Sequence, residues 1–133
     1  MKAMPDRMPV ILVADDSRLV TELFKRVFQQ HGYRVITTAN GTEALEIGLT
    51  QDLDLAVMDQ VMPGRVGAEV LQAWRAASID VPVIMVSAIE EPRMREQALE
   101  LGASFYLYKP ISSDELLAAV DRLLDPDGGV AAQ

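Results

Sequence analysis

A chain of 133 residues, with 50% hydrophobic and 24% charged residues, has the size and composition of one folded domain, which excludes a disordered protein. Its formal net charge of −8 opposes contact with a phosphate backbone, so direct nucleic-acid binding is not expected. The absence of cysteine excludes disulfides and thiolate metal sites, and no apolar run could span a bilayer, so a cytoplasmic protein without a membrane anchor is predicted.

The first half of the chain alternates short apolar runs with helical patterns. A strand is predicted over residues 10–14, followed by an amphipathic helix that ends at His31-Gly32. A second strand is expected over 33–38. The next helix opens at Asn40, with Glu43 three residues later at capping-box spacing. A third strand is expected over 53–59.

The second half repeats this pattern. A helix is predicted over residues 67–78, a strand over 81–87, a helix from Pro92 to Leu101-Gly102, and a strand over 105–108. The last helix starts at Ser112, with Glu115 at capping-box spacing, and ends at residue 124. Five such units predict an α/β fold, with a doubly wound five-stranded parallel sheet and five helices covering both faces.

The same pattern divides the chain into three parts. Residues 1–8 are expected to be an N-terminal leader and not a signal peptide, because they lack an apolar core. Residues 9–124 hold the predicted domain. The segment Asp125-Pro126-Asp127-Gly128-Gly129 should end the last helix, which makes residues 125–133 a flexible C-terminal tail.

Polar residues stand where four of the predicted strands end. Asp15-Asp16 follow the first strand, Asp59 ends the third, Ser87 ends the fourth, and Lys109 follows the fifth. The carboxyl ends of parallel strands lie at one edge of the sheet, so these side chains should converge there. Adjacent buried carboxylates need a cation to offset their charge, and hard oxygen ligands suit Mg²⁺. The pattern therefore predicts a site for a divalent metal and a phosphoryl group.

The order of these residues resembles that of a response-regulator receiver domain over residues 10–124. The resemblance is carried by Asp15-Asp16, by Asp59 with Met62-Pro63 behind it, by Ser87-Ala88, and by residues 102–110, which end in Lys109-Pro110. It implies a flavodoxin-like fold with strand order 2-1-3-4-5.

The resemblance also implies a role for each matching position. Asp59 corresponds to the phosphoacceptor. Mg²⁺, with Mn²⁺ as a possible substitute, would be held by Asp16 directly, by Asp15 largely through a bound water, by Asp59, and by the backbone carbonyl of Val61. The phosphoryl group would be bound by Ser87 and Lys109, with the small Ala88 leaving it accessible. Ser87 and Tyr106 correspond to the conformational switch, and the Lys109-Pro110 peptide bond to one that is commonly cis.

The implied function is phosphorelay signalling without separate substrate turnover. Asp59 would take a phosphoryl group from a sensor histidine kinase or a histidine phosphotransfer protein. The signal would pass to a downstream protein through the face made by the fourth helix, fifth strand and fifth helix. The kinase-facing surface would include Arg18, Leu19 and Glu22, and a stand-alone domain acting as a monomer or weak dimer is expected.

Two departures from the family pattern bear on this expectation. Arg65 and Val66 stand where a Met-Asp pair is customary, in a loop that partners would contact. Val61 and Ile89, at two positions that tune dephosphorylation in the family, are both apolar, which predicts a comparatively long-lived acyl phosphate.

Three other functions would each explain part of this pattern. A haloacid-dehalogenase-type phosphatase also forms an aspartyl phosphate, but its nucleophile ends the first strand and a second Asp follows two residues later. A nucleotide carrier would need a Gly-rich loop, which Asp15-Asp16-Ser17-Arg18 does not provide. A binding-only module would not need the acidic set and Lys109, although each of these residues alone could be an ordinary cap or a solvated side chain.

Overall fold

The computed structural model describes residues 8–125, which form a single sheet flanked by helices. The elements, in chain order, are β1 (Val10–Ala14), α1 (Arg18–Gln30), β2 (Arg34–Thr38), α2 (Gly41–Thr50), β3 (Leu55–Asp59), α3 (Gly67–Ala76), β4 (Val83–Ser87), α4 (Pro92–Glu100), β5 (Phe105–Tyr108) and α5 (Ser113–Leu124). The strands are all parallel and lie in the order β2-β1-β3-β4-β5. The predicted doubly wound fold and its strand order are confirmed.

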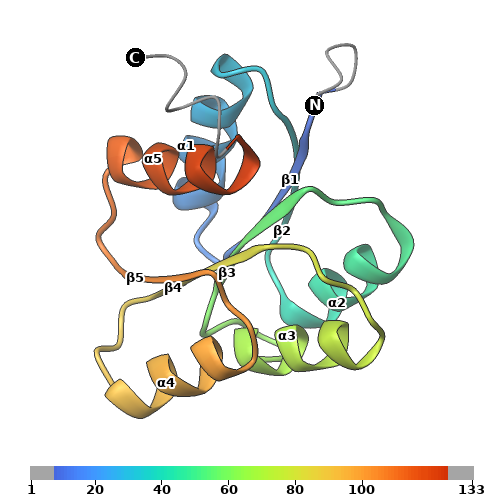
Figure 1. The fold of residues 1–133 in the computed structure, drawn as a ribbon. Helices are drawn as coiled ribbons and strands as arrows, with labels where there is room; N and C mark the ends of the chain where they lie inside the picture. Colours follow the sequence, from blue (N-terminus) through green and yellow to red (C-terminus); the bar gives the residue numbers. More distant parts are fainter. Residues whose placement is uncertain (1–7, 126–133) are drawn as a thin grey trace.

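Helices cover both faces of this sheet (Figure 1). One face carries α1 and α5, and the other carries α2, α3 and α4. Successive side chains of a strand point to opposite faces, so neighbouring residues of one strand enter different cores. In β3, Leu55 and Val57 belong to the core under α1 and α5, whereas Ala56 and Met58 belong to the core under α2 and α3. Burial on both faces explains why these strands read as continuous apolar runs.

Hydrogen bonds at the helix starts match the sequence signals. The side chain of Asn40 accepts the backbone N–H of Glu43 at 2.7 Å, and that of Ser112 accepts the N–H of Glu115 at 3.0 Å. The carboxylate of Glu43 does not complete a reciprocal capping box; it accepts the hydroxyl of Thr38 instead.

Several element boundaries differ from the prediction by one or two residues. The third strand begins at Leu55 rather than residue 53. The backbone N–H of Val10 donates to the side chain of Asp54, at Oδ2 and 2.7 Å, and not to a backbone carbonyl that would extend the strand pairing. The fourth begins at Val83 rather than residue 81, because Pro82 has no N–H for the ladder. The helix predicted to reach Ser78 ends at Ala76, and Ser78 has a left-handed φ of 64°.

The leader and tail predicted from the sequence fall mainly outside the described residues. Of these two segments only Met8 and Asp125 are described; Met8 is exposed, and Asp125 caps the end of α5. None of the helices within residues 8–125 is both long and apolar enough to cross a bilayer.

Close packing joins α2 to α3 through the one tryptophan of the chain. The Trp74 side chain is fully buried, and its Nε1–H donates to the backbone carbonyl of Leu45 at 3.2 Å. Its ring lies directly over Gly48, where an added Cβ would come within 2.3 Å of Trp74 Cε2. The absence of a side chain at Gly48 therefore sets how closely these two helices approach.

We expect Gly48→Ala to destabilise the protein by about 1–3 kcal/mol, because overpacking costs more than the ~1 kcal/mol that alanine ordinarily gains over glycine inside a helix. Urea unfolding followed by the fluorescence of Trp74 measures the change. Leu49→Ala, at an exposed neighbour on the same helix, is the control and should stay within about 0.5 kcal/mol of wild type. Equal or greater stability of Gly48→Ala would show that the helices can separate at no cost.

Candidate functional site

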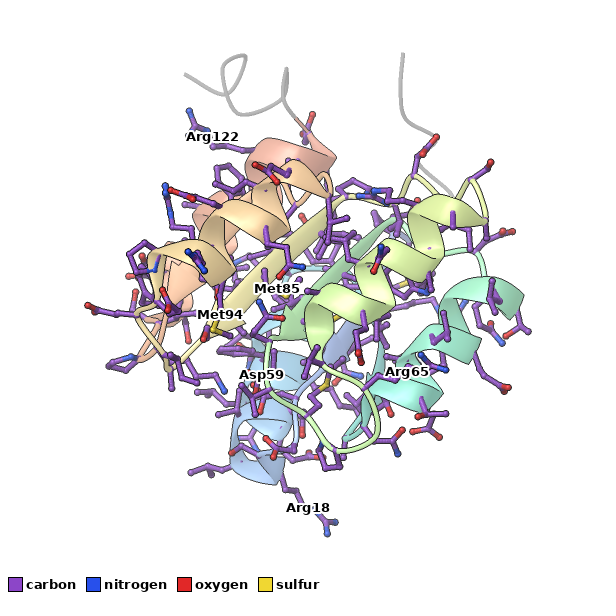
Figure 2. All side chains as sticks on the ribbon, turned by 90° about the horizontal axis from the view of Figure 1, so that it is seen from below. Arg18, Asp59, Arg65, Met85, Met94 and Arg122 are labelled. Atoms are coloured by element: carbon purple, nitrogen blue, oxygen red, sulfur yellow. The ribbon has the colours of Figure 1, made fainter. Side chains whose placement is uncertain are left out.

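The site forms at the carboxyl edge of the sheet, where the strand order puts β1 beside β3 and β4 beside β5. Asp59 is the last residue of β3, and Asp15 follows β1 directly. Ser87 is the last residue of β4, and Lys109 follows β5. Figure 2 shows Asp59 toward the end of the molecule that carries Arg18, at the start of α1, and away from Arg122 near the end of α5.

Lys109 pairs with two buried carboxylates at this edge. Its Nζ lies 2.9 Å from Asp15 Oδ2 and donates to Asp59 Oδ2 at 3.0 Å. Asp15 and Asp59 are 2% and 5% exposed, so both carboxylates depend on protein partners rather than on bulk water. The other oxygens accept backbone N–H groups: Asp15 Oδ1 that of Ser17 at 2.9 Å, and Asp59 Oδ1 that of Val61 at 3.2 Å.

Burial governs the charge of these groups. Burial raises the pKa of Asp59, and the negative charge of Asp15 adds to this rise, while the hydrogen bond from Lys109 offsets only part of it. For Lys109, burial alone would lower the pKa, but the two carboxylates outweigh that effect and raise it. The lysine is therefore held as an ammonium, but its positive charge does not fully offset the burial of the Asp59 carboxylate.

A third carboxylate joins this pair. One carboxylate oxygen from each of Asp15, Asp16 and Asp59 lies within 4.8 Å of the others, with Asp16 on the solvent side. Apart from the ion pair with Lys109, Asp15 Oδ2 accepts no hydrogen bond from any described residue, although it is buried. An incompletely satisfied buried oxygen among three converging carboxylates fits a hard divalent cation such as Mg²⁺.

Ser87 lies at the same edge, but its hydroxyl faces its own loop. The side chain is fully buried; its Oγ accepts the N–H of Ile89 at 3.0 Å and donates to the Ile89 carbonyl at 3.3 Å. The next residue, Ala88, is exposed. The structure thus brings Asp15, Asp16, Asp59 and Lys109 together, while the Ser87 hydroxyl bonds within the β4–α4 loop.

The remaining candidates lie around this group. The side chains of Val61 and Ile89 are 47% and 46% exposed, and neither carries a polar atom. The Tyr106 ring is buried, and the edge-on Tyr108 ring packs against it with centroids 5.6 Å apart. The peptide bond between Lys109 and Pro110 is cis.

Sequence reasoning missed Gln60, the residue directly after Asp59. Its side chain is 2% exposed; Oε1 accepts the N–H of Ala68 at 2.8 Å and Nε2 donates to the hydroxyl of Tyr106 at 3.5 Å. A polar residue between a strand and a proline-containing loop is ordinarily solvated. One available signal was its position directly after the predicted nucleophile.

Comparison with known proteins agrees with this geometry. The family profile of the response regulator receiver domain matches residues 11–121. The response regulator MprA of Mycobacterium sp. (strain KMS) is 38% identical over 126 residues, which cover 92% of this chain and 55% of that protein. The chain spans about half the length of the curated relatives it matches.

Solved structures show the same fold. The receiver domain of the Francisella response regulator 1452 is 34% identical with a TM-score of 0.83, covering 89% of this chain and 98% of that one. The chemotaxis response regulator CheY4 of Vibrio cholerae is 30% identical with a TM-score of 0.82, covering 89% of this chain and all of that one. With a family match over most of its length and relatives above 30% identity, this chain belongs to the response-regulator receiver domains of two-component signalling.

Proposed function

We propose that Asp59 is the phosphoacceptor and takes a phosphoryl group from a phosphohistidine donor. The observation that carries this proposal is the position of Lys109, whose ammonium pairs with the carboxylates of both Asp15 and Asp59. A carboxylate oxygen of Asp59 forms the new bond to phosphorus, the phosphorus–nitrogen bond of the donor breaks, and its electron pair returns to the imidazole. The product is an aspartyl phosphate.

The surrounding residues position this reaction and balance its charge. Asp15, Asp16, Asp59 and the backbone carbonyl of Val61 would hold Mg²⁺, for which Mn²⁺ could substitute. The bound ion supplies positive charge to the oxygens of the transferring group. Lys109 pairs with the phosphoryl oxygens, Ser87 turns from Ile89 to hydrogen-bond one of them, and the exposed, small Ala88 leaves room for the donor.

The response proceeds through Ser87 and Tyr106. Movement of the Ser87 hydroxyl toward the phosphoryl group favours the buried position of Tyr106, and this changes the face formed by α4, β5 and α5. A downstream protein reads that face. The donor is a sensor histidine kinase or a histidine phosphotransfer protein, which docks around the site and the start of α1, where Leu19 is 81% exposed.

Further parts of the proposal follow from the family. The domain forms and loses its own aspartyl phosphate without turning over a separate substrate. It acts in the cytoplasm as a monomer or weak dimer, and its net charge of −8 argues against direct nucleic-acid contact.

The first test is intact mass after incubation with acetyl phosphate and Mg²⁺. Wild type should gain one phosphoryl mass, whereas Asp59→Asn, or wild type without Mg²⁺, should gain none, because the nucleophile or its charge balance is missing. Asp52→Asn, at an exposed carboxylate between α2 and β3, is the control and should behave as wild type. An adduct that persists in Asp59→Asn, or no wild-type adduct from several donors, contradicts the assignment.

A second test concerns the lifetime of the phosphate. Val61 and Ile89 are exposed and apolar and cannot orient an attacking water, so Val61→Asn combined with Ile89→Gln should speed phosphate loss about threefold to tenfold, the effect of one added hydrogen bond. Loss is followed by mass after removal of the donor. Leu49→Asn, equally apolar and exposed in the wild type but on α2, is the control. An unchanged decay would show that these two positions do not limit hydrolysis.

A further inference from the structure

Gln60 is a polar side chain enclosed in the core directly behind the proposed phosphoacceptor. It is 2% exposed, and its backbone N–H donates to the carbonyl of Val86 at 2.8 Å, which continues the pairing of β3 with β4 past Asp59. A buried amide costs free energy unless its oxygen and nitrogen are both hydrogen-bonded. The partners of this amide therefore indicate what it does.

The oxygen of the amide caps α3. Val66 occupies the N-cap position of this helix and has no side-chain oxygen with which to accept an N–H. Gln60 takes over that task twice: its backbone carbonyl accepts the N–H of Gly67 at 2.8 Å, and its side-chain Oε1 accepts the N–H of Ala68 at 2.8 Å. The first two N–H groups of α3 are thereby satisfied by the residue that follows Asp59.

This capping bond fixes the direction of the amide nitrogen. A backbone N–H can only donate, so the side-chain oxygen must face Ala68 and Nε2 must face the other way. There Nε2 lies 3.5 Å from the hydroxyl oxygen of Tyr106 and donates to it. The amide thus joins the start of α3 to the aromatic residue of β5, and the longer Tyr106 contact is the easier of the two to break.

The position of Tyr106 needs such a partner. Its ring is only 8% exposed, although the Ser87 hydroxyl is bonded to the backbone of Ile89 and has not turned toward Asp59. Burial of the ring therefore does not depend on prior movement of Ser87. Within residues 8–125, the hydroxyl of the buried Tyr106 accepts a hydrogen bond from the Gln60 amide, and the Tyr108 ring packs edge-on against the Tyr106 ring.

We propose that Gln60 is a positioning residue that holds Tyr106 buried in the unphosphorylated chain and so presets the switch, an inference that rests on the proposed function for its regulatory part. If phosphorylation of Asp59 favours the buried ring, then holding the ring buried favours phosphorylation by the same free energy. Gln60 therefore increases, in the unphosphorylated chain, the population of the form that favours phosphorylation of Asp59.

The test measures the solvent exposure of Tyr106 by NMR of the whole chain labelled with ¹³C-tyrosine. Tyr106→Phe assigns its resonance among the three tyrosines, and a soluble neutral nitroxide broadens exposed rings. The variant Gln60→Leu with Val66→Asp removes the Tyr106 contact while supplying α3 with a new N-cap, so that loss of the cap is not the cause of any change.

In this double variant we expect broadening of the Tyr106 signal to rise about threefold or more, the population change that one hydrogen bond supports. Gln60→Glu should keep the wild-type value, because a buried carboxyl group that remains protonated accepts the Ala68 N–H and donates to the Tyr106 hydroxyl as the amide does. Gln72→Leu, at an exposed glutamine on α3, should match wild type. Unchanged broadening in Gln60→Leu with Val66→Asp overturns the proposal, and Val66→Asp alone should leave Tyr106 protected.

The rate of phosphorylation by acetyl phosphate with Mg²⁺ tests the regulatory part. If the chain with the buried ring is the form that accepts phosphate, the rate should fall in the same double variant, relative to Val66→Asp alone, by the factor by which the NMR experiment shows the buried population to fall. An exposed Tyr106 with an unchanged rate would overturn the coupling. A wild-type chain that never gains phosphate would refute the proposed function and leave the NMR result on Gln60 standing. If the wild-type chain gains phosphate but Tyr106 stays protected in Gln60→Leu with Val66→Asp, the inference alone is refuted.

Discussion

The ammonium of Lys109 between the carboxylates of Asp15 and Asp59 is the interaction on which the site depends. Two buried carboxylates repel each other, and removing either from water costs several kcal/mol unless a cation is near. The lysine reaches both at about 3 Å, yet Asp16 adds a third carboxylate to the same group. Three carboxylates and one ammonium leave two formal negative charges, which one divalent cation would balance.

Sheet topology makes this pairing possible. Asp15, Asp59 and Lys109 come from β1, β3 and β5 or the residues just after them, and the strand order places β3 between β1 and β4. Parallel strands bring their carboxyl ends to one edge, where the chain leaves the ladder and side chains can turn inward over the sheet. The apolar residues within these strands form the two cores, whereas the residues at or just after their carboxyl ends form the site.

Gln60 links that chemistry to the rest of the molecule. A residue inside the core can join the loop behind Asp59, the start of α3 and the Tyr106 ring because its amide both donates and accepts. The valine at the N-cap of α3 is tolerated because the same amide replaces the missing cap. An apparent departure of the sequence in the loop after Asp59 is thus compensated from within the fold.

The sequence by itself determined the ten elements and the strand-end polar residues, since periodicity, helix caps such as Asn40, and carboxylates after apolar runs are local signals. It placed the start of the third strand two residues too early, because the partner of Asp54 lies on β1. Only the tertiary structure decided the partners of Gln60 and the direction of the Ser87 hydroxyl. Both depend on residues that are distant in the chain or on loop geometry, and a polar side chain in a loop has no local pattern that tells burial from solvation.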